Sequence, residues 1–172
     1  MSMKLISRIA LTAAVVLSAF GTITYTSCNK DECKDVVCAN GGTCNSDNGA
    51  CTCASGFEGS LCETAWSTKF VASYSVTEQC TSSGGVGPYN ATISQSSSNN
   101  VNVNLNNFGD FNANITVSGT ITNTTTLSIP SQTVSGYTIS GSGTYNNGVI
   151  SITYTVSTTL SNETCTATWT KS

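Results

Sequence analysis

The sequence lacks histidine altogether, and only 9% of its 172 residues are charged. Arg8 is its one arginine, and from residue 28 onward four lysines face nine acidic residues, a side-chain charge of 4 − 9 = −5. Nucleic-acid binding depends on a basic footprint, so we expect no nucleic-acid partner. The missing histidine also removes the most common general base and the usual activator of a serine nucleophile.

The apolar run near the N-terminus is too short to cross a membrane. Ile9–Phe20 has twelve residues, whereas a spanning helix needs about 20. Lys4 and Arg8 come before this run and small residues follow it, which is the pattern of a signal peptide. We therefore expect residues 1–27 to be a signal peptide and the protein to be exported.

The cysteine count is odd, and Cys28 offers an explanation. An exported protein with nine cysteines leaves one outside its disulfides. Residues 25–28 read Tyr-Thr-Ser-Cys and resemble the lipobox of bacterial lipoproteins, with Tyr25 at a position usually held by Leu. The resemblance implies that Cys28 is lipidated and that its acyl chains, at about 0.8 kcal/mol per CH₂, hold the protein to the membrane. The alternative is ordinary secretion, with Cys28 as an unpaired thiol.

Residues 28–32 would then form a lipidated tether, and their charged residues have three interpretations. Lys30, Asp31 and Glu32 directly after a lipidated cysteine resemble the export signal of surface-displayed lipoproteins in some Gram-negative bacteria. That resemblance implies a protein anchored by lipid in the outer membrane and displayed on the cell surface. The same residues could instead be a solvated linker, or a calcium site, because hard oxygen ligands suit Ca²⁺.

Six cysteines form a cluster over residues 33–62 with the spacing C-x4-C-x5-C-x6-C-x-C-x8-C. With NGGTC at 40–44 and GFEG at 56–59, the cluster resembles the epidermal-growth-factor-like (EGF-like) module. A segment this short cannot bury a sufficient core, so bridges worth about 2–4 kcal/mol each replace it. Zinc binding is the alternative, but export favours disulfides and no histidine is present. The resemblance implies the pairs Cys33–Cys44, Cys38–Cys51 and Cys53–Cys62.

Beyond the cluster the composition changes sharply. Residues 64–172 carry only five charges in 109 residues and are rich in Ser, Thr, Asn and Gly. Apolar and polar residues alternate, as at Val101, Val103 and Leu105, which predicts strands with one buried face. Turn signals such as Asn147-Gly148 separate the alternating runs. No helix is expected, and about eight strands are predicted at 68–80, 88–95, 100–107, 111–120, 124–129, 133–140, 148–157 and 163–171.

Short connections between these strands favour an antiparallel up-and-down meander. Cys80 ends the first predicted strand and Cys165 lies in the last. If the two pair, the first and last strands must be close, because the Cα atoms of a disulfide lie within about 7 Å. This favours an all-β fold closed into a barrel, in a layout similar to small calycin or lipocalin-like barrels. A two-sheet sandwich could also bring these strands together.

We do not expect an enzyme. The acidic residues of this segment, Glu78, Asp110 and Glu163, lie at predicted strand ends or in turns, where carboxylates are usually solvated. Glycosidase chemistry needs two carboxyl groups around one bond, and only Lys69 and Lys171 offer an amine base for a nucleophile. The sequence therefore predicts no catalytic residue, no cofactor and no metal site.

Two non-catalytic functions remain. In the one we predict, the protein is a surface interaction module: the EGF-like segment is a spacer, and the Ser/Thr/Asn-rich surface contacts a protein or glycan partner. In the alternative, the barrel carries a small apolar ligand, since eight-stranded barrels are either packed or hollow. The side chains that would line such a cavity, or fill the interior, are Phe70, Tyr74, Tyr89, Phe111, Ile115, Ile152, Tyr154 and Trp169.

Overall fold

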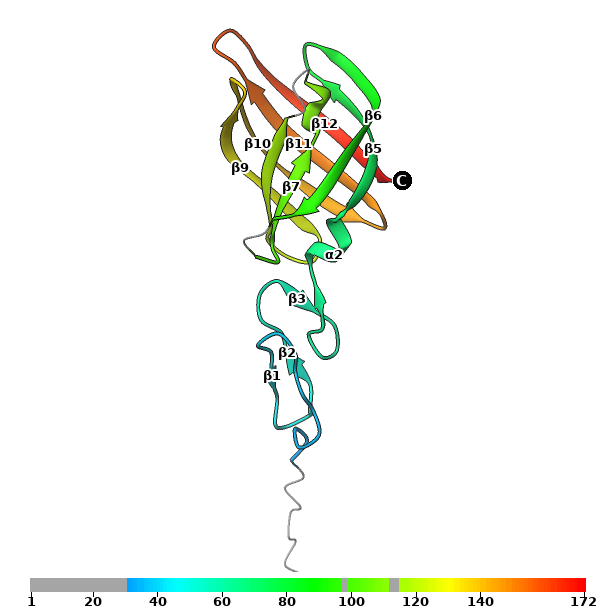
Figure 1. Cartoon of the computed structure of the whole chain (residues 1–172), viewed down its shortest axis with the longest axis vertical. Coiled ribbons are helices and arrows are strands. Elements are labelled where there is room, and N and C mark those ends of the chain that lie inside the picture. The colour runs from blue at the N-terminus through cyan, green and yellow to red at the C-terminus, as the bar shows by residue number, and fades with distance from the viewer. Residues whose placement is uncertain (1–30, 97–98, 112–114) are drawn as a thin grey trace, which may run out of the picture. The chain divides into compact units, whose positions relative to one another are not determined.

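The computed structural model describes residues 31–96, 99–111 and 115–172; the predicted signal peptide and Cys28 lie outside them. Within the described residues the chain is almost entirely β-structure, with one short α-helix and one 3₁₀ turn. Figure 1 shows a barrel of long strands and a separate set of short strands that precedes it in the chain. The all-β fold class predicted from the sequence is confirmed.

The barrel is built from eight antiparallel strands. Each strand pairs with its neighbours in sequence, and the last strand pairs with the first to close the circle. Cys165 lies opposite Cys80 in that closing pair, and the two form a disulfide. The prediction of a barrel is confirmed over the sandwich, and the architecture fits a calycin-like fold. The strands are β5 (Ala72–Cys80), β6 (Gly84–Gln95), β7 (Asn102–Asn106), β8 (Thr116–Ile121), β9 (Thr126–Val134), β10 (Tyr137–Asn146), β11 (Val149–Ser157) and β12 (Asn162–Lys171).

The first predicted strand, 68–80, begins later than expected. Residues Ser67–Phe70 form the single helical turn α2, and β5 starts at Ala72. Ser67 and Phe70 are both buried, and the Tyr74 hydroxyl donates a hydrogen bond to the Phe70 carbonyl (2.6 Å). The expectation of no helix was therefore wrong at this one turn. Four residues are too few for a helical periodicity to show in the sequence.

The turn between β9 and β10 also differs from the prediction, which places a break at 130–132. β9 instead continues through Pro130 to Val134, and the pairing register with β10 shifts alongside it. Proline cannot donate to a strand ladder, and bulges are among the few places where a sheet accepts it. The reversal falls at Ser135-Gly136, whose φ angles are 51° and 84°. Two positive φ values are what a tight two-residue hairpin requires.

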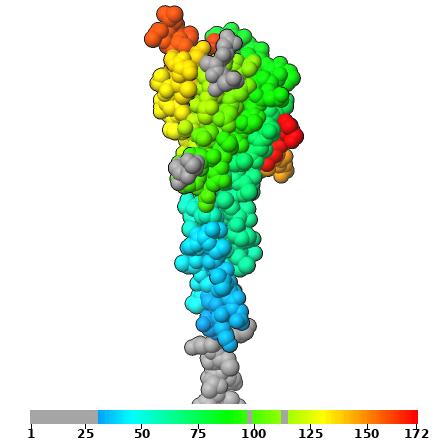
Figure 2. Space-filling view, in the orientation of Figure 1, coloured from blue at the N-terminus to red at the C-terminus, as the bar shows by residue number. Residues whose placement is uncertain are grey.

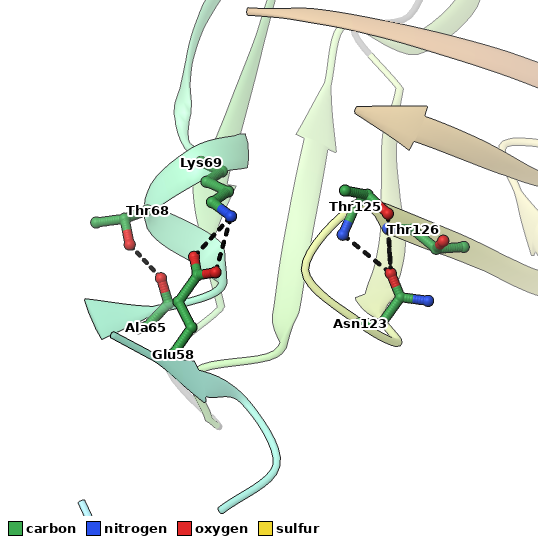
Figure 3. Close-up of polar contacts among 7 residues, drawn as sticks. All are labelled: Glu58, Ala65, Thr68, Lys69, Asn123, Thr125 and Thr126. Atoms are coloured by element: carbon green, nitrogen blue, oxygen red, sulfur yellow. Dashed lines mark hydrogen bonds and ion pairs between the residues drawn. The ribbon is translucent and has the colours of Figure 1, made fainter. Parts of the chain in front are cut away.

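A side chain holds the turn between β8 and β9 (Figure 3). The Oδ1 atom of Asn123 accepts hydrogen bonds from the backbone N–H groups of Thr125 and Thr126, both at 2.9 Å. The Thr125 hydroxyl donates to the same oxygen (3.2 Å). Asparagine favours turns because its side chain can replace the backbone as acceptor in this way.

Three disulfides hold the segment that precedes the barrel. Its strands are only two residues long: β1 (Thr43–Cys44) pairs with β2 (Cys51–Thr52), and β3 (Phe57–Glu58) pairs with β4 (Thr64–Ala65). Of the hydrophobic residues described between 31 and 65, only Cys62 is buried. Cross-links therefore replace an apolar core here. The disulfides join the same partners that the EGF-like resemblance implies: Cys33–Cys44, Cys38–Cys51 and Cys53–Cys62.

Polar contacts connect the β3–β4 pair to α2. Lys69 Nζ lies 2.8 Å from each carboxylate oxygen of Glu58, an ion pair drawn in Figure 3. The Thr68 hydroxyl donates to the Ala65 carbonyl. The backbone N–H of Trp66 donates to the Gly56 carbonyl (2.9 Å). These contacts join residues that lie close in sequence. They hold in place the chain between the last disulfide and the first barrel strand.

The alternation of apolar and polar residues places the core inside the barrel. On β11, for example, Ile150, Ile152 and Tyr154 are at most 1% exposed, whereas the intervening residues face water. Two interior positions of β10 are glycines. A Cβ atom at Gly141 would lie 2.6 Å from Tyr154 Cβ, and one at Gly143 would lie 2.9 Å from Ile152 Cγ1. At Gly141 the closest atom would be the Thr153 carbonyl oxygen, so these glycines leave room for the backbone of the next strand as well as for its large side chains.

Candidate functional site

All eight residues predicted to line the barrel interior belong to the core or pack against it. Phe70, Tyr74, Ile115, Ile152, Tyr154 and Trp169 are at most 2% exposed. Tyr89 and Phe111 are only partly buried. Phe70, Phe111 and Ile115 are not on strands as predicted, because Phe70 lies in α2 and the other two precede β8. Phe111 instead stacks on Tyr137, with ring centroids 4.7 Å apart.

Phe108 is a central residue of the interior that the sequence reasoning did not identify. It belongs to the 3₁₀ turn η1 (Phe108–Asp110), which the sequence shows as a turn between strands. Its ring centroid lies 4.6 Å from that of Tyr154 and 6.0 Å from that of Trp169. The signal was available, because a large aromatic residue in a tight turn has to bury its ring against something.

These contacts form a continuous aromatic layer across the barrel. Trp169 also packs edge-on against Tyr74, with centroids 5.7 Å apart. The chain therefore passes from Tyr74 through Trp169 and Phe108 to Tyr154, with rings from β5, β12, η1 and β11. Ring pairs at these separations are in contact. Three of the side chains proposed to surround a ligand, Tyr74, Trp169 and Tyr154, are thus joined into one layer, with Phe108 between the last two.

Glu78 is a buried carboxyl within this interior. It lies on β5 and is 6% exposed. Tyr154 donates a hydrogen bond from its hydroxyl to Glu78 Oε2 (2.9 Å), and Tyr89 forms another with the same carboxyl. The Tyr89 hydroxyl in turn accepts the backbone N–H of Gly109 (3.1 Å). One polar network therefore links β5, β6, β11 and η1.

The electrostatics of this network favour its neutral form. Burial raises the pKa of the Glu78 carboxyl, the hydrogen bonds from Tyr154 and Tyr89 lower it in part, and the charge of Asp110 raises it again. Burial also raises the pKa values of Tyr89 and Tyr154, and the nearby Glu78 raises them further. Both phenols thus remain protonated donors over the physiological range, which suits a structural role in joining strands.

The expectation that Glu78 is solvated at a strand end was wrong. Tyr74, Val76, Glu78 and Cys80 alternate along β5, and all four are buried. The period-two rule that predicts the strand also predicts this position to face inward, so the signal was present in the sequence. Asp110 is exposed, as expected for a turn. Glu163 accepts a hydrogen bond from the Ser83 hydroxyl (2.8 Å).

Glu163 also lies close to the closing disulfide. One of its carboxylate oxygens and the sulfur atoms of Cys80 and Cys165 all fall within 4.8 Å of one another. Such a cluster could hold a metal ion only with free thiolates, and here both sulfur atoms are joined to each other.

In the described part of the chain, no helix has the length and apolar character that a membrane crossing requires.

The outer surface of four neighbouring strands is built almost entirely from hydroxyl side chains. We call the outward residues of β10, β11, β12 and β5 the hydroxyl face. Cross-strand neighbours on it include Thr153 with Thr166 and Thr168 with Thr77. No charged residue belongs to the set. Its members are Thr138, Ser140, Ser142, Thr144, Asn146, Val149, Ser151, Thr153, Thr155, Ser157, Asn162, Thr164, Thr166, Thr168, Thr170, Ser73, Ser75, Thr77 and Gln79, of which only Val149 is apolar.

The hydroxyl face follows from the same alternation that fills the interior. Threonine is β-branched and therefore favours strands. In a run such as Thr164–Thr170, every second side chain faces water. About 25% of the residues of a typical soluble domain are charged, whereas no residue of the hydroxyl face is charged. Hydroxyl and amide groups both donate and accept hydrogen bonds. This surface is therefore equipped for neutral, hydrogen-bonding partners rather than for ionic ones.

Comparison of the chain with known protein families, with characterised proteins and with solved structures found no match.

Proposed function

We propose that the protein is a non-catalytic, lipid-anchored protein of the cell envelope that acts as a surface interaction module. The observation that carries this proposal is the aromatic layer of Tyr74, Trp169, Phe108 and Tyr154, whose rings contact one another where a ligand would lie. A barrel filled by its own side chains acts through its outside. The uncharged hydroxyl face is the outer surface best suited to that task.

The cysteines support the anchoring part of the proposal. Eight of the nine cysteines pair with one another in four disulfides. Cys28, at the end of the lipobox-like segment, is the ninth. A thiol reserved for lipidation accounts for the odd number, and an anchor made of several acyl chains holds a protein durably. We infer an outer-membrane location with display on the cell surface.

The EGF-like segment serves as a spacer in this proposal. Its first and third, second and fourth, and fifth and sixth cysteines are joined, which is the pairing that the EGF-like resemblance implies. A segment with little apolar core and three cross-links resists unfolding in an oxidising environment. It would hold the barrel away from the membrane that carries the lipidated Cys28.

One observation favours the alternative function, carriage of a small ligand. The Nε1–H group of Trp169 is buried and has no hydrogen-bond partner among the described residues. A buried donor without an acceptor costs about 1–3 kcal/mol, and a ligand atom inside the barrel could satisfy it. One unmet donor is a smaller argument than a connected layer of four aromatic rings, so we place this function second.

Native mass spectrometry of the exported protein tests the proposal. With disulfides intact and no exposure to organic solvent, we expect the mass of the processed polypeptide and its lipid, reduced by eight hydrogen atoms for four bridges, with no apolar small molecule bound. A reproducible additional mass that is lost on denaturation and belongs to an apolar molecule would indicate a hollow barrel and overturn the proposal. The Cys28→Ala variant should leave the detergent phase for the aqueous phase, and unchanged partition would contradict lipid anchoring.

A further inference from the structure

A groove lies on the outside of the barrel, at one end of β5. It has a volume of about 400 Å³, within the range of small-molecule sites. Figure 2 shows β6 and β7 in green and the C-terminal residues in red on this side of the barrel. The residues that line the groove are Ser73, Tyr74, Asn90, Ala91, Thr92, Asn106, Asn107 and Ser172.

Hydrogen bonds hold one wall of this groove in place. Asn107 has a left-handed backbone (φ 56°), which asparagine tolerates better than most residues, and its Nδ2 donates to the Asn90 carbonyl (2.7 Å). Asn106 Nδ2 donates to the hydroxyls of Thr92 and Ser94, both at 3.1 Å. The wall is therefore organised before any ligand arrives, which reduces the entropy cost of binding.

Other polar groups in the groove remain available. The side-chain amide of Asn90 and the hydroxyls of Ser73 and Ser172 make no hydrogen bond to other described residues. No side chain that lines the groove is charged. An anionic ligand would find no positive charge here. Amides and hydroxyls, which both donate and accept, match the hydroxyl groups of a neutral sugar.

The groove continues along β5 into the hydroxyl face. Ser75 and Thr77 are the next outward residues after Ser73, and a second depression of about 230 Å³ is lined by Thr77, Gln79, Thr166 and Thr168. Glu78 also borders it but turns its carboxyl inward to Tyr154. From Ser73 to Gln79 the strand extends about 20 Å. Two depressions joined by one line of hydroxyls suit a chain of sugars better than a single ring.

We propose that the groove and the outward face of β5 bind a neutral oligosaccharide. This rests on the proposed function, because it names the partner class of the same outer surface. The Asn90 amide and the Ser73 and Ser172 hydroxyls hydrogen-bond the first sugar units in the groove. Ser75, Thr77 and Gln79 contact the units that follow. Specificity comes from the hydroxyl pattern of the sugar, and negatively charged glycans are not favoured by any group in the groove.

Nuclear magnetic resonance titration of the exported protein, with its disulfides intact, tests this proposal. The probes are the hexamers of cellulose, amylose, chitin and mannan, with hexagalacturonate as the acidic comparison. We expect at least one neutral hexamer to shift the amide signals of Ser73, Asn90, Thr92 and Thr77 in a saturable way, and hexagalacturonate to shift none. The inference is overturned if no neutral hexamer produces saturable shifts, or if only the acidic one does.

Two groove variants and two matched controls make the test specific. Ser73→Ile and Asn90→Val place apolar side chains in the groove, and we expect at least tenfold weaker binding of the neutral hexamer. Ser118→Ile and Asn104→Val make the same changes on the outer faces of β8 and β7, outside both the groove and the hydroxyl face, and should leave the affinity unchanged. Equal affinity in all four variants would overturn the site, provided that their amide spectra stay dispersed as in a folded barrel.

This failure is separable from that of the proposed function. If no neutral hexamer binds but native mass spectrometry still finds no small molecule in the barrel, the oligosaccharide inference falls and the surface module stands. If a co-purified apolar ligand is found, the proposed function falls whatever the titration shows, whereas a co-purified neutral sugar would support both.

Discussion

The disulfide-rich segment and the barrel are stabilised by opposite means. Between residues 31 and 65, three disulfides surround almost no buried apolar side chain. The barrel has one disulfide and a continuous core from Phe70 to Trp169. Cross-links stabilise chiefly by restricting the unfolded chain, whereas core packing stabilises the folded state by removing apolar surface from water. The two regions should therefore fail under different treatments.

Removing one bridge from the disulfide-rich segment should have the most severe outcome, because it should unfold that segment entirely. In the double variant Cys38→Ala, Cys51→Ala, we expect loss of about 2–5 kcal/mol, enough to unfold a segment that has no core of its own. Limited proteolysis should then cut between residues 33 and 62 while the barrel survives. If the barrel were digested at the same rate, the two regions would be one cooperative unit and the comparison would fail.

Removing the central aromatic ring should destabilise the barrel rather than the disulfide-rich segment. Phe108→Ala deletes a buried side chain that contacts Tyr154 and Trp169, and we expect a loss of about 3–5 kcal/mol in the stability of the barrel. Denaturant unfolding followed by tryptophan fluorescence measures it. Phe111→Ala, at a half-buried ring outside the layer, is the matched control and should cost less. Equal losses would show that Phe108 is not central to the core.

The barrel disulfide offers a direct comparison with the three others. Cys80 and Cys165 lie 85 residues apart in sequence, and the variant with both changed to Ala should lose about 2–4 kcal/mol. The backbone pairing of β5 with β12 continues from Cys80 to Tyr74, so we expect the barrel to remain folded at room temperature. Circular dichroism during heating checks this. A chain that is unfolded at room temperature would mean that the barrel, too, depends on its cross-link.

Glu78 should make the stability of the barrel depend on pH. Its pKa in the folded protein is raised above the ordinary value of 4.5, so the folded state holds the proton more tightly than the unfolded state. The stabilisation of the folded state by this proton is complete below pH 4.5 and is lost as pH rises through the pKa of Glu78 in the folded protein. Glu78→Gln, which keeps the shape without the charge, should be more stable than the wild type at pH 8.

The difference between Glu78→Gln and the wild type isolates this group from the other carboxyls. We expect the two unfolding free energies to converge as the pH falls toward 4, because Glu78 is then protonated in both states. A variant that is less stable than the wild type at pH 8 would show that the ionised carboxylate is the form the barrel prefers.

The ion pair between Glu58 and Lys69 should have the smallest effect. Its two side chains are 24% and 35% exposed, and solvated pairs of this kind contribute about 0–1 kcal/mol. Lys69→Met should therefore change the midpoint of barrel unfolding by less than Phe108→Ala or the variant with both Cys80 and Cys165 changed to Ala. A larger change would mean that the chain around α2 is essential to the closure of the barrel.

Much of the architecture could be predicted from the sequence, because it depends on local patterns. Alternation such as Val101, Val103 and Leu105 identifies a strand wherever the strand lies, and the positions of Cys80 and Cys165 near the two ends of the meander indicate closure. The boundaries were less accurate. The turn at Ser135-Gly136 was missed because a bulge at Pro130 allows β9 to continue.

What the sequence by itself determined is the strand order, the inward and outward faces and the uncharged hydroxyl surface, since each follows from residues two apart. Only the tertiary structure decided what fills the barrel and what is hollowed on its outside. Phe108 enters the core because η1 folds over the barrel, and Asn107 forms a groove wall because it reaches the Asn90 carbonyl 17 residues away. Contacts of this kind join segments whose separation no local pattern records, so they arise only when the barrel closes.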